Sequence, residues 1–522
     1  MLAQINSAAL NGLKAISVKV EVNANFANQQ GLADPIFTVV GLPDKSVVES
    51  RQRVRSAIEN SNQRLPRLNI TANFAPADIR KEGSGFDLPL AIALLKCVDI
   101  IKKADLSSYM FVGELGLDGS VRPIRGALPI AIEARRLGYE ALIVPKYNER
   151  EAGVVNNLRV YGVETLTEVV DYLNGLSPLE CVKVDTREEF YRAQIDYPLD
   201  FADVKGQEGA KRAFEVAAAG GHNLLLVGSP GCGKSMMAKR LPSILPQLTL
   251  SESLETTQIY SIAGKVSRDT SLIAQRPFRS PHHTVSDVAL IGGGANLQPG
   301  EISLAHNGVL FLDELPEYSR SALETMRQPL EDRTITISRA KYNATLPCSF
   351  MLVAAMNPCP CGYYNDPYHE CHCSPGQVQR YMSKISGPLL DRIDLQLELA
   401  PVPLEELQKA PRGESSAHIR ERVIRARSIQ TERFRGERGV HCNAQMTPLL
   451  IERFAQPDRD GREALRLAMQ RLNLSARAYE RILKMARTIA DLAGSEKVEA
   501  MHIAEAIGYR NLDRGDWAER GI

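Results

Sequence analysis

The 522-residue sequence has no long uninterrupted apolar run, no export signal and almost no surplus charge. Its longest strongly apolar stretch, LPLAIALLKCVDII from Leu88, contains Lys96 and Asp99 and is shorter than the roughly 20 residues that a membrane-spanning helix needs. We therefore expect a buried helix there and no membrane partner. The start of the chain has neither a basic segment before an apolar block nor a cleavage-site pattern, which predicts a cytoplasmic protein.

The formal net charge is only +1, so the charge of the whole chain gives no argument for nucleic-acid binding. Any such binding has to depend on local patches. The nine cysteines are an odd number, which does not suit a disulfide framework. In a reducing compartment they are expected to stay as thiols or to bind metal.

The composition, 44% hydrophobic and 24% charged, is typical of a soluble globular protein. The chain is too long for one ordinary core, because domains cluster at roughly 100 to 200 residues. We expect three folded units and one connector. They are an α/β domain over 1–175, a linker over 176–200, a second α/β domain over 201–400 and a helical region over 401–522.

The first unit mixes short apolar strands, expected over 16–22, 134–145 and 157–163, with helical stretches such as 46–61. This mixture indicates an α/β fold with its own core.

In the second unit, strand-like runs over 223–228, 308–314 and 349–357 alternate with helical stretches. Such alternation is typical of a parallel sheet flanked by helices. The last part of the chain has apolar residues three and four positions apart over 416–434 and 475–492, which predicts amphipathic helices forming a lid.

The sequence GSPGCGKS follows the strand NLLLV and precedes a helical stretch. In this context the motif is a phosphate-binding loop, in which glycines let backbone N–H groups point at the phosphates of ATP. The lysine is expected to reach the β and γ oxygens, and the last serine hydroxyl to bind Mg²⁺. The predicted nucleotide-binding residues are Gly228, Ser229, Pro230, Gly231, Cys232, Gly233, Lys234 and Ser235.

The run GVLFLDE ends in Asp313 and Glu314, which we expect at the carboxyl end of a parallel strand neighbouring the first. Asp313 is predicted to hold the Mg²⁺ shell, and Glu314 to position and polarise the attacking water. A third run, SFMLVAAMN, ends in Asn357, whose amide can bind the water or the γ-phosphate. The alternative for Asn357 is an ordinary turn residue at the end of a strand.

The order of P-loop, LFLDE, strand-end Asn and LLDRIDL resembles that of AAA+ ATPases of the magnesium-chelatase branch, over residues 201 to about 510. The resemblance implies that Arg392 is an arginine finger donated to the next subunit's ATP, and that Arg477 is a lid arginine sensing the γ-phosphate. Both roles require a ring, and the alternative is surface salt bridging. Gly206 and Gln207 of FADVKGQ resemble the adenine-side box of the same superfamily.

Two further segments are expected at the central pore of such a ring. Residues 278–308 are similar to the helix-2 insertion of the chelatase and helicase branch, and TITISRAKYNATLP predicts a hairpin with Arg339 and Lys341 at its tip. In this superfamily such hairpins grip DNA, and the alternative is a solvated turn. His282 and His283 are adjacent without a third ligand at a suitable spacing, so we expect no metal there.

A cysteine-rich insertion follows Asn357, over residues 358–374. Its two C-x-C pairs, separated by nine residues, can close a tetrahedral structural zinc site formed by four thiolates: Cys359, Cys361, Cys371 and Cys373. The loop has too little apolar content to hold itself together, and a metal would supply that stability. The alternatives are reduced thiols without metal, or His369 or His372 as substitute ligands.

The stretches RKEGSGFDLPLAIALL and VGELGLDGSVRPIRGALPIAIEARRLGYEALIVP resemble the proteolytic domain of Lon, which uses a Ser–Lys dyad. Alignment of the motifs places Gly85 where the serine should stand, with Ser84 one position away, and Leu128 where the lysine should stand. Because a hydroxyl needs an adjacent base to attack a peptide bond, we expect a scaffold and no protease activity.

The combination of these features resembles the YifB/ComM family across nearly the full chain. The resemblance implies a hexameric, ATP-dependent DNA helicase that drives branch migration and aids integration of incoming DNA during bacterial transformation. Its DNA partner would be single-stranded, forked or branched. The alternatives are a chelatase-like remodeller of a protein partner and, with no turnover, a binding module.

Overall fold

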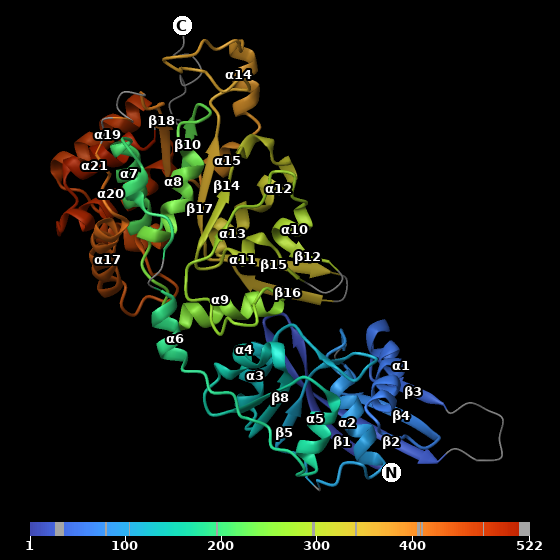
Figure 1. Ribbon diagram of the computed structural model, residues 1–522. Coiled ribbons are helices and arrows are strands. Elements are labelled where there is room, and N and C mark those ends of the chain that lie inside the picture. Colours follow the sequence, from blue (N-terminus) through green and yellow to red (C-terminus); the bar gives the residue numbers. More distant parts are fainter. Residues whose placement is uncertain are drawn as a thin grey trace.

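The computed structural model describes residues 1–26, 36–78, 81–103, 105–194, 197–294, 298–339, 342–403, 408, 411–472 and 474–510. The first unit lies at one end of the molecule, and helix α9 (Leu250–Ile262) of the second unit lies over it (Figure 1). Within the described ranges, none of the helices combines the length and the hydropathy needed to cross a bilayer.

The amino-terminal part contains a seven-stranded mixed sheet in the order β3-β4-β2-β1-β5-β8-β9. Its two longest strands form an antiparallel hairpin, and the last three strands pair in parallel. The strands are β1 (Leu2–Asn11), β2 (Lys14–Phe26), β3 (Phe37–Val40), β4 (Leu68–Ala75), β5 (Tyr109–Phe111), β8 (Ala141–Pro145) and β9 (Arg159–Val163).

Helices α1 (Lys45–Asn60) and α2 (Asp87–Cys97) pack against this sheet, and α2 is the buried helix expected from the sequence. The expected strand over 134–145 is wrong in its first part, because residues 134–136 end helix α3 (Ala127–Arg136). Gly138, with φ of 81°, follows that helix, and the strand itself begins only at Ala141. The apolar residues of the helix end continued the strand pattern in the sequence, so the pattern alone did not separate the two elements.

The second sheet has five strands, all parallel, in the order β11-β14-β17-β10-β18. They are β10 (Leu224–Gly228), β11 (Phe278–Arg279), β14 (Val309–Leu312), β17 (Met351–Met356) and β18 (Leu395–Leu399). The strand ending at Asp313 was expected beside the P-loop strand, and this is wrong, because β17 pairs with both and lies between them. All three runs are apolar on both faces, as central parallel strands are, so the sequence pattern did not specify their order.

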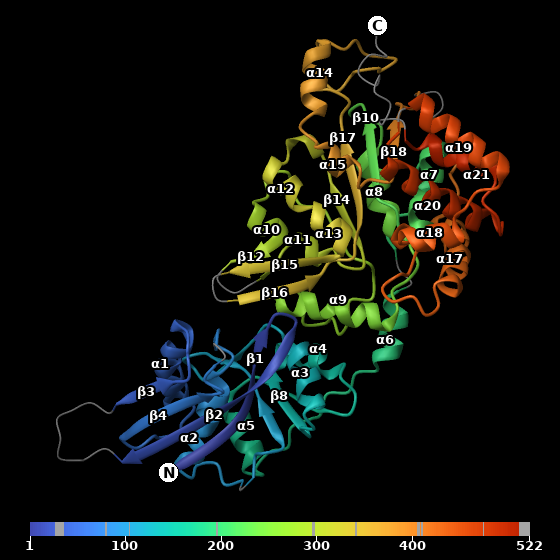
Figure 2. The ribbon, with the colours of Figure 1, turned by 180° about the vertical axis from the view of Figure 1, so that it is seen from behind.

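Helices of the P-loop unit and of the lid share one core with this sheet. That core includes Phe214 of α7 (Glu208–Gly220), Val353 of β17, Val423 of α17 (Ser416–Arg433) and Ile482 of α20 (Ala476–Ala493). The remaining lid helices are α18 (Pro448–Phe454), α19 (Arg459–Leu472) and α21 (Ala500–Gly508). Seen from behind, the lid lies beside α7 and β18, away from the amino-terminal sheet (Figure 2).

Two small hairpins lie side by side on the opposite flank of the core (Figures 1 and 2). One pairs β12 (Gly292–Gly293) with β13 (Gln298–Pro299) inside the segment similar to a helix-2 insertion. The other pairs β15 (Thr334–Arg339) with β16 (Tyr342–Pro347), as expected from the sequence. Gly292 faces Ile337 so closely that an added Cβ would lie 2.9 Å from its Cδ1 atom. The two hairpins therefore pack against each other.

The segment 176–200 contains a short helix, α6 (Thr186–Ala193), which connects the two parts. Phe190 of this helix packs with Val154 of the first part and Leu248, Leu272 and Ala274 of the second. In addition, the Gly126 backbone N–H donates to the Ser261 carbonyl at 3.0 Å. The predicted domain boundaries stay predictions, but apolar contacts do join the parts across this segment.

A buried carboxylate ties the sheet to the lid. The Asp394 side chain accepts from the backbone N–H of Asn223 at 3.1 Å and pairs with Arg481 of α20. His222 lies 3.4 Å from the same carboxylate and 2.8 Å from Thr488 of α20. Burial opposes ionisation of Asp394, yet Arg481 and His222 hold its pKa below the ordinary value.

Asp394→Ala removes the acceptor of this network and leaves Arg481 and His222 without their shared partner. Because breaking a buried ion pair from one side costs about 3 to 5 kcal/mol, we expect a clear fall in the thermal midpoint. The depressed pKa means that the contribution of Asp394 is present above about pH 4, the unfolded-state pKa, and is lost as the pH falls. The wild type should therefore lose part of its advantage over the variant in acid.

The matched control is Glu463→Ala, which breaks the Glu463–Arg466 pair three residues apart on α19, where both side chains are exposed. Its effect should stay within about 0.5 kcal/mol. Equal thermal midpoints for the two variants would contradict the proposed role of Asp394.

Candidate nucleotide-binding site

The phosphate-binding loop connects β10 to helix α8 (Lys234–Arg240). Gly231 and Gly233 have φ of 82° and 92°, a conformation that L side chains rarely adopt. A Cβ on Gly228 would lie 2.6 Å from the Leu399 carbonyl oxygen of the neighbouring strand β18. The glycines are thus required by the backbone of the loop. The N-terminus of α8, which follows the loop, offers unpaired backbone N–H groups of the kind that bind phosphate oxygens.

The Lys234 ammonium lies inside this loop. It donates to the carbonyl oxygens of Gly228 at 2.5 Å and Ser229 at 3.0 Å, and to the Asn357 amide oxygen at 3.2 Å. The P-loop strand and the strand ending at Asn357 are adjacent, which brings these side chains together. A bound γ-phosphate would contact the same ammonium and the same amide.

The Ser235 hydroxyl donates to the Asp313 carboxylate at 2.6 Å. These two oxygens are the ligand type that Mg²⁺ prefers, and together they fit its site beside the phosphates. Asp313 also accepts from the backbone N–H of Glu314 at 3.0 Å. The structure therefore brings together Lys234, Ser235, Asp313 and Asn357, as the sequence predicted, although their roles stay predictions.

Glu314 has a left-handed backbone, with φ of 52° and ψ of 48°. Non-glycine residues in this region are strained, and such strain gathers at functional sites. The Glu314 carboxylate lies 3.0 Å from His283 Nδ1, a residue of the segment just before α10 (Asp287–Ile291) and the β12–β13 hairpin. The sequence does not indicate this contact, because no motif relates His283 to a partner 31 residues away.

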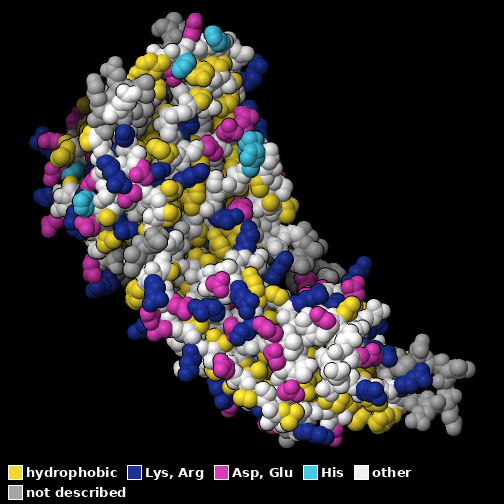
Figure 3. Space-filling view, viewed as in Figure 1, with side chains coloured by type: hydrophobic (Ala, Val, Ile, Leu, Met, Phe, Trp, Pro, Cys, Tyr) yellow, Lys and Arg dark blue, Asp and Glu magenta, His cyan; other side chains and the backbone are white. Residues whose placement is uncertain are grey.

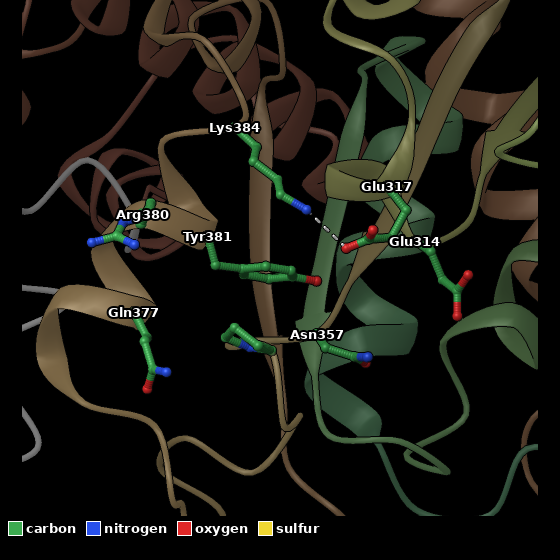
Figure 4. A pocket seen from close by; sticks show the side chains of 8 residues that line it. Glu314, Glu317, Asn357, Gln377, Arg380, Tyr381 and Lys384 are labelled. Carbon is green, nitrogen blue, oxygen red and sulfur yellow. Dashed lines mark hydrogen bonds and ion pairs between the residues drawn. The ribbon is translucent and has the colours of Figure 1, made fainter.

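A cavity of about 430 Å³ opens beside Glu314 and Asn357 (Figure 4). Its other wall is formed by helix α14 (Pro375–Met382) and the residue Lys384 after it, which lies 3.2 Å from Glu317. Burial and Glu317 raise the pKa of Tyr381. The cavity is lined by Glu314, Glu317, Asn357, Pro360, Gln377, Arg380, Tyr381 and Lys384. Two cations, Arg380 and Lys384, therefore lie near the expected position of the γ-phosphate. No sequence motif predicts them.

Gly206 and Gln207 lie near the carboxyl end of β18, on the P-loop side of the sheet. Both have a positive φ, of 65° and 58°. The Gln207 amide donates to the Ala400 carbonyl at 2.6 Å, and a Cβ on Gly206 would lie 3.4 Å from Val402. Their position is compatible with the predicted adenine side of the nucleotide.

Arg392 lies at the amino-terminal ends of the parallel strands, whereas the P-loop of the same chain lies at their carboxyl-terminal ends. Its carbonyl accepts from the Asn223 side chain, and Asn223 precedes β10, whereas the P-loop follows β10. The guanidinium is only 9% exposed, pairs with Glu331 at 2.5 Å and donates to the Pro388 carbonyl at 2.6 Å. Arg477 is 63% exposed and lies 3.4 Å from Asp391, next to Arg392 in the chain. The structure therefore brings these two regions together, but not with the nucleotide site of the same chain.

Of the two residues predicted at the hairpin tip, Arg339 is the last residue of β15, in register with Tyr342. Lys341 lies outside the described residues. Their predicted contact with DNA stays a prediction.

The four predicted zinc ligands lie together: their sulfur atoms are all within 4.8 Å of one another. Cys359 Sγ is 3.3 Å from Cys361 and 3.7 Å from Cys371, and Cys361 is 3.6 Å from Cys371. A tetrahedral ion with metal–sulfur bonds of about 2.3 Å separates its sulfurs by roughly 3.8 Å. The cluster is therefore compatible with zinc.

In the part that resembles the Lon proteolytic domain, Leu128 is fully buried, and a Cβ on Gly85 would lie 3.7 Å from Ile124. Ser84 donates to the Glu114 carboxylate, and the Lys81 ammonium donates to the Pro76 carbonyl. The expected lack of protease activity stays a prediction.

Three family descriptions match successive parts of the chain. "Subunit ChlI of Mg-chelatase" matches residues 20–148, "Magnesium chelatase, subunit ChlI" matches 200–407, and "Magnesium chelatase, subunit ChlI C-terminal" matches 413–510. Together with the P-loop geometry, these matches define a protein with an AAA+ core of the magnesium-chelatase type.

Relatives of full length define the family more narrowly. The chain is 44% identical over 514 residues to competence protein ComM of Haemophilus influenzae, and 43% identical over 514 residues to protein YifB of Escherichia coli. Each alignment covers 98% of both chains. The protein belongs to the ComM/YifB family. A partial match, 30% identical over 152 residues, links it to Lon protease 2 of Bacillus subtilis and covers 28% of each chain.

Glu314→Gln tests the predicted role of the carboxylate beside the cavity. The amide cannot take a proton from water, so we expect the rate of ATP hydrolysis to fall by a factor of about 10² to 10⁴, the usual contribution of general base catalysis. Nucleotide affinity should be retained, because Lys234 and the loop are unchanged. Steady-state phosphate release and nucleotide titration measure both quantities.

Glu324→Gln is the control, because Glu324 lies on helix α12 (Arg320–Thr325) and pairs with Arg327. It should hydrolyse ATP at the wild-type rate. Turnover by Glu314→Gln within twofold of wild type would rule out the assigned role.

Proposed function

We propose that the protein is an ATP-hydrolysing, ring-forming motor, most simply a hexamer, that unwinds DNA and drives branch migration of recombination intermediates. In this proposal it aids the integration of incoming DNA during natural transformation. One observation carries the ring-forming ATPase in this proposal. The predicted phosphate-binding residues gather at the carboxyl ends of the strands, whereas Arg392 and Arg477 lie at the opposite ends.

This separation supports a ring. A guanidinium stabilises the charge that develops on a transferring phosphoryl group, but Arg392 cannot reach the ATP of its own chain from the far edge. In a head-to-tail ring, each chain would present Arg392 and Arg477 to the nucleotide of the next. To bind phosphate oxygens of that nucleotide, Arg392 would have to break its ion pair with Glu331, and Arg477 its ion pair with Asp391.

Mg²⁺ and ATP fit the residues of the P-loop edge. Ser235 and Asp313 would hold the ion, which neutralises the β and γ oxygens, and Lys234 would bind the same phosphates. Glu314 would hold and polarise the attacking water once it is released from His283. Asn357, which bonds Lys234, would orient that water or the γ-phosphate.

Two observations support DNA as the proposed substrate. The two adjacent hairpins belong to the segments expected at the pore of the ring. Strand β15 of one hairpin ends at Arg339, and the sequence has Lys341 two residues later. The relative in Haemophilus influenzae is named a competence protein. On the face shown in Figure 3, side chains of both charges are mixed. Contacts with the phosphate backbone of DNA would therefore have to come from local cationic loops.

The second candidate is a remodeller of a protein partner. It is favoured by the family descriptions, all three of which name a magnesium-chelatase subunit. That candidate uses the same nucleotide site and the same ring. It differs only in its substrate, which would be a protein in place of DNA.

Strand displacement and branch migration with forked and four-way DNA separate the two candidates. We expect DNA to stimulate ATP hydrolysis by the wild type and ATP to drive strand separation, both lost in Lys234→Ala. Arg339→Ala with Lys341→Ala should keep basal hydrolysis and lose the stimulation, because the cationic contacts to phosphates are gone. ATP hydrolysis indifferent to every DNA tested would reject the DNA motor in favour of the protein remodeller.

A further inference from the structure

The cysteine loop, residues 358–374, joins two elements of the nucleotide site. It leaves β17 directly after Asn357 and ends at Ser374, the N-cap of helix α14, whose residues form one wall of the cavity. Pro360 of the loop lines the same cavity. The fold of this loop is therefore connected at both ends to groups beside the expected γ-phosphate.

The loop also touches the phosphate-binding loop itself. The Ser229 hydroxyl donates a short hydrogen bond to the Asp366 carboxylate. Gly362, with φ of 91°, lies so close to the P-loop that an added Cβ would be 2.8 Å from Pro230 Cδ. The cysteine loop thus packs on the first two residues after Gly228.

Asp366 is held in place from within the cysteine loop. Its second carboxylate oxygen accepts from the backbone N–H groups of Tyr368 at 2.8 Å and His369 at 3.0 Å, and its side chain is only 2% exposed. A buried carboxylate with this many donors has a fixed direction. The segment that carries it, residues 362–370, is closed at its two ends by Cys361 and Cys371, whose sulfurs lie 3.6 Å apart.

Closure of that segment needs a cross-link. Within the cysteine loop, Tyr364 and the four cysteines pack against the apolar core. Ordering a loop costs about 1 to 2 kcal/mol per residue in backbone entropy. A thiolate-bound ion supplies the missing free energy, since metal binding and folding of such loops are coupled. The spacing of the sulfurs suits a single soft divalent cation.

We propose that a metal ion bound by Cys359, Cys361, Cys371 and Cys373 sets the nucleotide affinity, with Asp366 as the positioning residue that transmits it to the P-loop through Ser229. The metal fixes the 362–370 segment, the segment fixes Asp366, and Asp366 fixes the start of the phosphate-binding loop. A loop already in its binding conformation avoids the cost of ordering at the moment of binding. The inference rests on the nucleotide-binding part of the proposed function and is independent of its DNA part.

The test measures zinc content of the purified full-length chain and its dissociation constant for a fluorescent ADP with Mg²⁺. Wild type should carry one zinc per chain. Cys371→Ser should lose the zinc and bind nucleotide about tenfold more weakly, the factor expected for one hydrogen bond to a charged group. Asp366→Ala should keep the zinc and show the same weakening. The double variant should be no weaker than either, because both act on one path.

Two further variants keep the test specific. Ser229→Ala removes the same bond from the P-loop side and should match Asp366→Ala with its zinc intact. Glu370→Ala, an exposed residue of the same loop, should bind nucleotide and zinc as the wild type does. A zinc-selective chelator, with Mg²⁺ kept in excess, should weaken binding by the wild type and leave the affinity of Asp366→Ala unchanged. This result separates the proposed path from general loss of the fold.

Wild-type affinity in Cys371→Ser, or after chelation, would overturn the proposal. The proposal would also be overturned if the losses of affinity in Cys371→Ser and Asp366→Ala were fully additive, or if Asp366→Ala kept the wild-type affinity. Each result means that Asp366 does not transmit the effect of the metal. If ATP hydrolysis proved independent of DNA and the zinc and affinity results were as expected, the DNA motor would be rejected and this inference would be supported. A wild type without measurable nucleotide affinity would contradict both.

Discussion

The parallel pairing of β17 with both β10 and β14 is the constraint on which the rest of the site depends. Parallel strands end at the same edge of a sheet, so groups far apart in the chain meet there. Lys234 bonds Asn357 because β17 lies beside β10, and Ser235 bonds Asp313 although their strands are not neighbours. The position of β17 thus places Asn357 between the P-loop and the acidic strand end, where the proposed mechanism needs its amide.

The same sheet explains why one chain is an incomplete catalyst in this account. Its other edge carries Asn223, Arg392 and Asp394, and the last of these is tied to the lid through Arg481 and His222. The lid and this end of the sheet are therefore joined as one unit, in which the pair of Arg477 with Asp391 places Arg477 near Arg392. Any change in the nucleotide of one chain would reach the next through this unit. The cysteine loop, in contrast, acts on the P-loop of its own chain.

Much of the site could be predicted from the sequence because its motifs carry their own local context. GSPGCGKS lies between an apolar strand and a helix, and the paired C-x-C motifs are close enough in the chain to meet without a long-range contact. The order of the strands was not predictable, since β14 and β17 have the same apolar pattern. The contacts of His283 with Glu314, and of Asp366 with Ser229, join residues that no motif relates. Only the fold brings them together.

The central claim, that hydrolysis needs Glu314 of one chain and Arg392 of the next, is tested most directly by mixing two inactive variants. Glu314→Gln and Arg392→Ala should each fail to hydrolyse ATP alone. Mixed in equal amounts and allowed to exchange subunits, they should recover activity, since about one quarter of the interfaces in a head-to-tail ring combine an intact Glu314 with an intact Arg392. A mixture that forms rings and stays inactive would contradict the account.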